Sequence, residues 1–136
     1  MRRKATALWN GNLKEGKGNL TTDSTVLDET QYSFSTRFED GVGTNPEELL
    51  AAAHAGCFTM QLSAFLTEAG FVPDELKTVS TIVFENGAIV RSELELTAKV
   101  PSIDNIKFQE LAQKAKDNCP VSKAFSFEKT LQATLL

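Results

Sequence analysis

The sequence is poor in the side chains that build cross-links and metal centres. Its 136 residues include two cysteines and one histidine. Two cysteines cannot supply the dense disulfide framework of small secreted domains, and a chain of this length can bury a core without one. Thiol and imidazole chemistry is therefore confined to three positions, which are His54, Cys57 and Cys119.

The sequence also lacks the features that direct chains to membranes, to nucleic acids or out of the cell. No apolar run approaches the roughly 20 residues of a membrane span. The net charge of −4 argues against a nucleic-acid or anionic-membrane partner. The first residues, MRRKATALWNG, are basic but contain no apolar segment like that of a secretory signal. We therefore expect a cytoplasmic location, where two cysteines stay reduced, bind a metal or cycle between redox states.

No repeat, low-complexity tract or linker divides the chain, so we expect a single domain over residues 1–136. The apolar periodicity predicts an α+β fold with mainly antiparallel strand pairing. The predicted elements are a strand at 4–11, a turn and strand within 14–24, a strand at 30–40, a long helix at 45–70, a hairpin at 76–100, a helix at 102–118, a short helix entered at Pro120 and a closing strand at 124–136.

The long helix carries strong signals at both ends. Asn45 can cap it, Pro46 takes the first helical position, and Glu48 is spaced as in a capping box. Gly70 suits the position after the last turn, and Pro73 prevents continuation. The residues expected on its buried side are Leu49, Leu50, Ala53, Cys57, Met60, Ala64 and Phe65.

The hairpin and the second helix each have one apolar side. Asn86 and Gly87 supply a two-residue turn between the hairpin strands. The residues expected to face the core are Val90, Leu94, Leu96, Ala98 and Val100 in the hairpin, and Ile103, Ile106, Leu111 and Ala115 in the helix.

Cys57 has an ordinary and a functional interpretation. Free cysteine is among the most buried residue types, so it can simply be a packing residue. A reactive thiolate here would need help, because an apolar site raises the pKa of a thiol and the helix dipole acts mainly at the first turn. The missing cation must come from elsewhere in the fold. His54 lies three residues earlier on the same side, but most such histidines serve packing or an interface.

Cys119 is placed differently. If Pro120 begins a helix, Cys119 is its N-cap, where backbone N–H groups favour a thiolate. The ordinary alternative is a cysteine that happens to end a helix. A metal site of His54, Cys57 and Cys119 is a weaker hypothesis, because the sequence offers no fourth ligand for zinc.

Two charged residues near the long helix also qualify as site candidates. Arg37 shares a face of the predicted strand with small serines, which usually means a solvated arginine. Glu47 lies in the first turn of the helix, where the dipole favours a carboxylate. Because Glu48 fits the capping box, Glu47 has no structural task of its own.

The segments TRFEDGVGTNPEELLAAAHAGCF and DNCPVS resemble the OsmC/Ohr family of osmotically induced and organic-hydroperoxide-resistance proteins, and AAHAGCF is more similar to the OsmC branch. The resemblance runs from WNG to the last strand. It implies antiparallel sheets, a long central helix and a second helix in an intertwined homodimer. The hairpin around Asn86 and Gly87 is a few residues shorter than the family pattern.

The resemblance implies a thiol-dependent peroxidase without a cofactor, acting in oxidative or osmotic stress. Peroxidatic and resolving cysteines match Cys57 and Cys119, and the active-site arginine and acid match Arg37 and Glu47. The Cys57 thiolate would attack a hydroperoxide to give a sulfenic acid. Cys119 would convert it to a disulfide, which a lipoyl, thioredoxin-like or other external dithiol would reduce. Apolar neighbours of the thiol favour organic hydroperoxides over hydrogen peroxide.

Helix geometry adds a prediction about assembly. Ten residues separate Glu47 from Cys57, and ten residues of helix rise about 15 Å. We therefore expect a two-fold dimer in which Glu47 and Arg37 reach the partner subunit's Cys57. Two other functions stay open, a redox-sensing or small-molecule-binding dimer of the same fold and a structural dimer with incidental cysteines.

Overall fold

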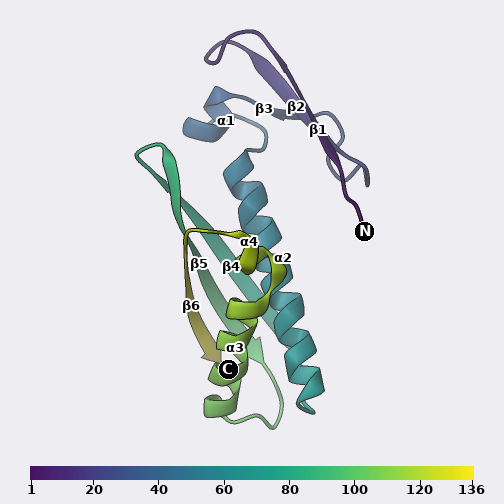
Figure 1. Cartoon of the computed structure of the whole chain (residues 1–136), viewed down its shortest axis with the longest axis vertical. Helices are drawn as coiled ribbons and strands as arrows, with labels where there is room; N and C mark the ends of the chain where they lie inside the picture. Colours follow the sequence, from purple (N-terminus) through teal and green to yellow (C-terminus); the bar gives the residue numbers. More distant parts are fainter. The chain divides into compact units, whose positions relative to one another are not determined.

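Six strands and four helices follow one another along residues 1–136, all of which the computed structural model describes (Figure 1). The chain forms two compact units, residues 1–49 and residues 50–136, and the long helix α2 crosses the boundary between them. The elements are β1 (Ala5–Asn10), β2 (Lys17–Thr22), β3 (Thr30–Tyr32), α1 (Phe34–Phe38), α2 (Pro46–Glu68), β4 (Glu75–Glu85), β5 (Ala88–Lys99), α3 (Asn105–Asn118), α4 (Pro120–Ala124) and β6 (Glu128–Leu135).

The first unit contains a three-stranded antiparallel sheet in the order β1-β2-β3. The prediction of a strand through residues 30–40 was wrong, because β3 ends at Tyr32 and α1 follows at once. Ser33 caps α1 by accepting a hydrogen bond from the Thr36 backbone N–H, and the Thr36 hydroxyl accepts one from the Ser33 N–H. This reciprocal cap turns an alternating pattern into a short helix. Arg37 therefore lies on a helix.

The predicted ends of α2 are confirmed. The Asn45 side chain accepts a hydrogen bond of 2.8 Å from the Glu48 N–H, and Pro46 is the first helical residue. Gly70, with φ at 93°, follows the last turn. There the Phe71 N–H donates to the Leu66 carbonyl and the Gly70 N–H to the Thr67 carbonyl, at 2.8 and 3.0 Å. These two bonds form a Schellman motif, which the glycine makes possible.

The predicted buried side of α2 was wrong by part of a turn. The fully buried residues are His54, Phe58, Leu62 and Leu66. Met60, expected inside, is 77% exposed, and Cys57 is half-buried. The cause is that α2 is apolar on nearly every side, so its periodicity does not select one face.

Much of the apolar surface of α2 is left uncovered by the chain itself. By length and composition alone the helix is apolar enough to cross a membrane, which was not expected from the sequence, and only 22% of its most apolar window is buried. Core helices of water-soluble proteins meet the same test. An apolar helix with so little cover within one chain is also typical of an interface.

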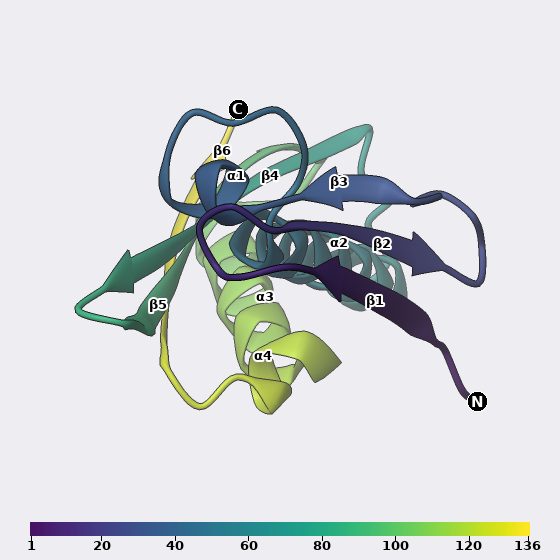
Figure 2. The same ribbon diagram turned by 90° about the horizontal axis from the view of Figure 1, so that it is seen from above.

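The second unit is a three-stranded sheet, β4-β5-β6, with helices packed on one face (Figure 2). The β4–β5 hairpin is confirmed, and its turn residues Asn86 and Gly87 have φ values of 51° and 79°. Strand β6 pairs parallel to β5, an exception to the mainly antiparallel pattern. The core residues come from α2, β5 and α3, and include Phe58, Leu62, Leu66, Leu94, Leu96, Ala98, Phe108, Leu111, Ala112 and Ala115.

Helix α3 also differs from its predicted orientation. Leu111 and Ala115 are buried as expected, but Ile106 is 83% exposed and Phe108 is fully buried in its place. Asp104 caps the helix by accepting a hydrogen bond from the Lys107 N–H. The buried side is therefore formed by Phe108, Leu111, Ala112 and Ala115.

Candidate active site: two thiols and an ion pair

Cys57 projects from the middle of α2 and is half-buried. It lines a pocket of about 320 Å³ together with Met60, Gln61, Ala64 and Pro120. The backbone N–H of Val121 in α4 lies near its sulfur and acts to lower the pKa of the thiol. The thiol is thus reachable from solvent, and one backbone donor favours its ionised form.

Cys119 lies at the N-cap of α4, as the sequence predicted. Its side chain is fully buried. The Ser122 N–H donates to its sulfur over 3.3 Å, and the thiol donates to the Ser122 hydroxyl oxygen over 3.1 Å. The sulfur is therefore held by two groups of the same serine, one on the backbone and one on the side chain.

The structure brings the two thiols together within the second unit. Both are free, and Cys119 lies close enough to Cys57 to affect the pKa of its thiol. Burial raises the pKa of Cys57 above its ordinary value, the Val121 N–H opposes this rise, and Cys119 adds to it. None of these groups is a cation. A reactive Cys57 thiolate therefore needs a positive charge from outside this set.

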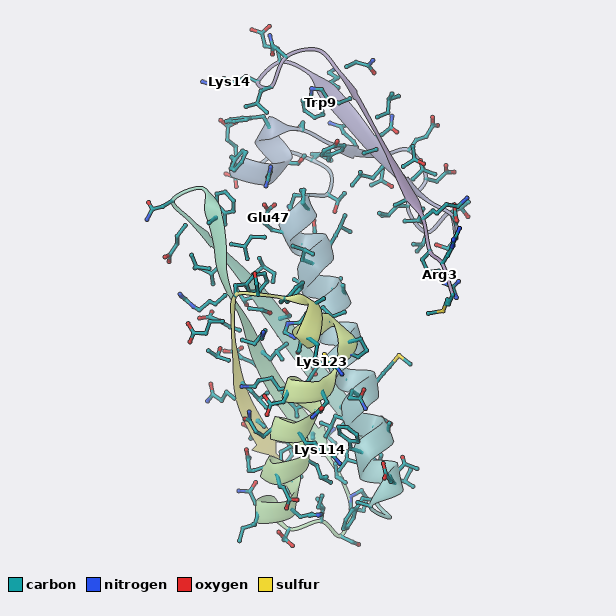
Figure 3. The ribbon with its side chains drawn as sticks, viewed as in Figure 1. Arg3, Trp9, Lys14, Glu47, Lys114 and Lys123 are labelled. Carbon is teal, nitrogen blue, oxygen red and sulfur yellow. The ribbon has the colours of Figure 1, made fainter.

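Arg37 and Glu47 are brought together in the first unit. The Arg37 Nε and Nη2 atoms lie 2.9 and 2.8 Å from Glu47 Oε1. The guanidinium also lies over the Phe38 ring, 5.1 Å from its centroid. Glu47 stands in the first turn of α2, as Figure 3 shows. The sequence left open that Arg37 is simply solvated and that Glu47 has no specific role. The structure shows instead that the two side chains form an ion pair.

Glu48, and not Glu47, makes the hydrogen bonds at the start of α2, so the Glu47 carboxylate can bind Arg37. The Glu48 carboxylate accepts a hydrogen bond of 3.1 Å from the Thr44 hydroxyl, and its backbone N–H is bonded to Asn45. The second carboxylate oxygen of Glu47, Oε2, is buried and has no hydrogen-bond partner in the chain. A buried carboxylate oxygen without a donor is costly, so a donor from another molecule would stabilise it.

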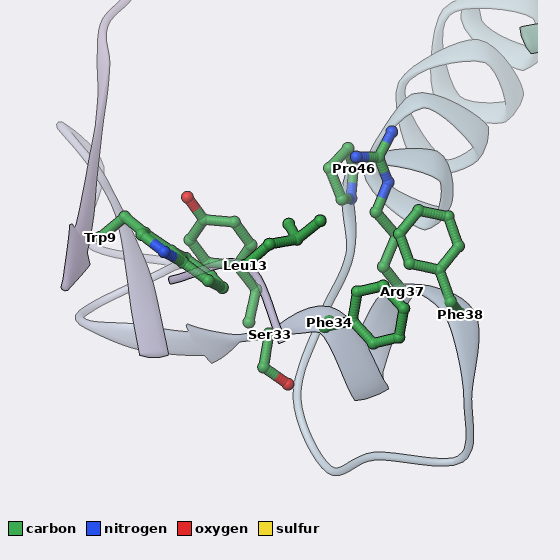
Figure 4. Close-up of a pocket in the computed structure, with 8 residues that line it drawn as sticks. Trp9, Leu13, Ser33, Phe34, Arg37, Phe38 and Pro46 are labelled. Atoms are coloured by element: carbon green, nitrogen blue, oxygen red, sulfur yellow. The ribbon is translucent and has the colours of Figure 1, made fainter. Parts of the chain in front are cut away.

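An apolar pocket of about 290 Å³ adjoins Arg37 in the first unit. Figure 4 shows the arginine beside an open space bordered by rings and aliphatic side chains. Its lining consists of Trp9, Leu13, Tyr32, Ser33, Phe34, Arg37, Phe38 and Pro46. One cation at the edge of an aromatic pocket suits a ligand with a polar end and an apolar body.

His54 has contacts that its sequence position did not predict. It is fully buried on α2, with Nδ1 2.6 Å from the Ser92 hydroxyl and Nε2 2.7 Å from the Ser122 hydroxyl. Burial, followed by the charge of Lys129, lowers the pKa of His54. Both ring nitrogens are bonded to serines, and no group of three or more His, Cys, Asp or Glu side chains is arranged to hold a metal ion. The metal-site hypothesis gains no support.

Sequence comparison places the chain among known relatives. It is 44% identical over 137 residues to peroxiredoxin OsmC of Escherichia coli strain K12, covering 98% of this chain and 96% of that protein. It is 33% identical over 109 residues to the organic hydroperoxide resistance protein OhrB of Bacillus subtilis strain 168, covering 79% and 80%. The stronger match agrees with the resemblance to the OsmC branch.

Solved structures and a family model agree. The crystal structure of OhrB from B. subtilis matches with a TM-score of 0.65 and 26% identity, covering 98% of both chains. An OsmC-like protein from Mycoplasma pneumoniae matches with a TM-score of 0.78, covering 100% of this chain and 98% of that one, and at 13% identity it supports the fold alone. A family model described as OsmC-like protein matches residues 38–134. The chain therefore belongs to the OsmC family.

Proposed function

We propose that this protein is a thiol-dependent peroxidase that reduces organic hydroperoxides. The observation that carries the proposal is the proximity of two free thiols. Cys57 is half-exposed on α2, and Cys119 is buried at the N-cap of α4. Two free thiols close to one another, one open to a substrate and one enclosed, suit a reaction in which the first attacks and the second resolves. The names of the relatives, peroxiredoxin OsmC and organic hydroperoxide resistance protein, support the same function.

The chemistry balances in two steps. The Cys57 thiolate attacks the distal oxygen of a hydroperoxide, the O–O bond breaks, and the alkoxide takes a proton to leave as an alcohol. Cys57 is then a sulfenic acid. Cys119 forms a disulfide with it and water is released, after which an external dithiol, lipoyl or thioredoxin-like, reduces the disulfide.

Arg37 is the cation that we assign to the thiolate. Burial raises the pKa of Cys57, so without a positive charge little thiolate exists at neutral pH. Arg37 is oriented by its ion pair with Glu47, and a guanidinium keeps its charge under all physiological conditions. It can stabilise both the thiolate and the negative charge that develops on the departing oxygen.

We propose that the site is shared across a two-fold homodimer. Helix α2 is continuous from Pro46 to Glu68, and ten residues of α-helix rise about 15 Å. A Glu47 that orients Arg37 therefore serves the partner subunit's Cys57 more easily than its own. The unpartnered Oε2 of Glu47 and the uncovered apolar surface of α2 both support a second copy at this place.

The substrate class follows from the surroundings of Arg37. The aromatic pocket beside it offers burial to an alkyl or aryl group, at about 25 cal/mol per Å² of apolar surface. Hydrogen peroxide has no such group and gains nothing from the pocket. We therefore expect organic hydroperoxides to be preferred, and we place the activity in the cytoplasm as a defence against oxidative or osmotic stress.

The function is tested by following cumene hydroperoxide in the presence of a dithiol. We expect sustained consumption by the native chain, none by Cys57→Ser, and a single turnover by Cys119→Ser that leaves Cys57 as a sulfenic or more oxidised species. Stoichiometric oxidation of the native chain without turnover would instead favour a redox sensor. If neither consumption nor a disulfide is found, the peroxidase proposal is wrong and the structural alternative remains.

A further inference from the structure

A buried chain of hydrogen bonds runs from Cys119 into the core of the second unit. The Cys119 sulfur lies 3.1 Å from the Ser122 hydroxyl, which lies 2.7 Å from His54 Nε2. On the other side of the ring, Nδ1 lies 2.6 Å from the Ser92 hydroxyl. These four residues come from three elements, α4 with its N-cap, α2 and β5, and each is at most 2% exposed.

The peroxidase reaction described above gives Ser122 and His54 no task. Burying an imidazole is unfavourable unless both nitrogens are bonded, and two serines meet that need here. Packing alone, however, does not require that one of these serines also contact a reacting sulfur through both its hydroxyl and its backbone N–H.

We propose that Ser122 and His54 form a proton relay for the resolving thiol of Cys119. The relay rests on the proposed two-cysteine function. Cys119 is enclosed, so its proton cannot pass directly to bulk water when the thiol attacks. A continuous hydrogen-bonded path leads from the sulfur through the Ser122 hydroxyl to His54 Nε2.

The step balances as follows. The Cys119 sulfur attacks the sulfur of the Cys57 sulfenic acid, an S–S bond forms and the S–O bond breaks. The hydroxide that leaves takes a proton from water. The Cys119 proton moves to Ser122 Oγ while Ser122 gives its own proton to Nε2. The imidazole passes its Nδ1 proton to the Ser92 hydroxyl, which lies 3.1 Å from the half-buried Ser80 hydroxyl, and a proton leaves to solvent there. The reverse transfer restores the tautomer when the disulfide is reduced. The Ser122 backbone N–H holds the sulfur as its negative charge develops.

This role requires one tautomer of His54. Nδ1 must carry the proton and donate to Ser92, so that Nε2 is free to accept from Ser122. The groups around the ring agree with a neutral imidazole. They are the two serine hydroxyls, the Phe125 ring at 5.1 Å in an edge-on arrangement, and the Lys129 ammonium, whose charge acts together with burial to lower the pKa of His54. Ser122 is thus the group that touches the reacting atom, and His54 is a positioning residue behind it.

The kinetic test separates the two chemical steps. Reduced protein is mixed with one equivalent of cumene hydroperoxide, quenched with acid, and assayed by mass spectrometry for dimedone-trapped sulfenic acid and for disulfide. In Ser122→Ala we expect an unchanged rate of hydroperoxide consumption but a disulfide step slower by about tenfold or more. Its rate should also rise between about pH 7 and pH 9, where that of the native chain is flat, because solvent base must replace the relay.

Two variants serve as controls. Ser122→Thr keeps the hydroxyl and should restore the disulfide rate to within about threefold. Thr59→Val also removes a partly buried hydroxyl, one bonded to the Thr78 hydroxyl at 2.7 Å, and should leave both steps unchanged. A native disulfide rate and pH profile in Ser122→Ala would overturn the relay.

A second measurement does not depend on peroxidase activity. His54 is the only histidine in the chain, so its two imidazole nitrogens give unambiguous ¹⁵N NMR signals. In the reduced protein at neutral pH we expect a proton on Nδ1 and none on Nε2. A proton on Nε2 would overturn the relay even if the native chain is fully active. A native chain that forms no sulfenic acid would count against the proposed function, while the tautomer would still decide the relay.

Discussion

Arg37 binds Glu47 through a single carboxylate oxygen. Both Nε and Nη2 lie within 2.9 Å of Oε1, while Oε2 is buried with no hydrogen-bond partner in the chain. An isolated structural ion pair would gain more from two parallel bonds, one to each oxygen. The observed geometry leaves one oxygen for a donor that the single chain does not supply, as expected of a site completed by a second subunit.

The first prediction concerns this ion pair. Glu47→Gln should lower kcat/KM for an organic hydroperoxide by about tenfold or more, because the guanidinium loses the charge that orients it. The free energy of unfolding should change by less than about 1 kcal/mol, because Arg37 is 39% exposed and glutamine keeps the size of Glu47 and one acceptor oxygen. The matched control is Glu93→Gln, which breaks the exposed Arg91–Glu93 pair of 2.7 Å and should leave kcat/KM unchanged. An equal loss of kcat/KM in Glu47→Gln and Glu93→Gln would show that Glu47 has no specific role in the reaction.

The second prediction concerns pH. Burial raises the pKa of Cys57, and a nearby cation lowers a thiol pKa by about 1–3 units. Removing Arg37 by Arg37→Met should therefore move the midpoint of the pH–rate profile upward by that amount, so that the rate near neutral pH falls and partly recovers in alkali. Alkylation of Cys57 by iodoacetamide, followed across pH in a Cys119→Ser background, reports the midpoint. An unchanged midpoint would mean that Arg37 does not act on the thiolate.

The third prediction concerns the aromatic pocket. Leu13 lines it and is 64% exposed, so Leu13→Ser should hardly affect folding. It should lower kcat/KM for cumene hydroperoxide by about three- to tenfold through lost apolar burial, and leave hydrogen peroxide unaffected. Val26→Ser changes an 82% exposed apolar residue outside the pocket lining and serves as the control. A similar loss with both peroxides would argue against the pocket as the substrate site.

The ends of the helices were predictable from sequence, and their buried sides were not. Caps and turns are local, so Asn45, Gly70 and the Asn86–Gly87 turn could be identified from adjacent residues. The buried side of α2 depends on what packs against it, and an apolar helix offers several equivalent choices. The helix at Arg37 was missed because its Ser33–Thr36 cap lies within a pattern that also alternates.

In the candidate site, too, local features could be predicted from the sequence and long-range contacts could not. The N-cap position of Cys119 could be predicted from Pro120 alone, and its pairing with Cys57 was predicted from the family resemblance. The bonds of His54 to Ser92 and Ser122 span 38 and 68 residues of sequence. No local pattern reveals such partners, because they are set by the packing of α2 against β5 and α4.

The fourth prediction tests the corrected orientation of α3. Phe108→Ala removes a fully buried ring and should destabilise the protein by about 3–5 kcal/mol, through lost burial and the cavity left behind. Ile106→Ala, at a position 83% exposed, should change the free energy of unfolding by less than about 0.5 kcal/mol. Urea denaturation measures both. A large loss from Ile106→Ala would mean that this side chain is covered, for example by a second subunit.

The central claim is a peroxidase site built from two subunits, and complementation between two inactive variants tests it most directly. Cys57→Ser and Arg37→Ala are mixed under conditions in which subunits exchange, and exchange is verified by native mass spectrometry. A heterodimer then contains one site with a native Cys57 from one chain and a native Arg37 from the other. We predict that hydroperoxide consumption returns, to at most about half of the native level per dimer. Verified exchange without any return of activity would show that each chain builds its site alone, and would contradict the shared site.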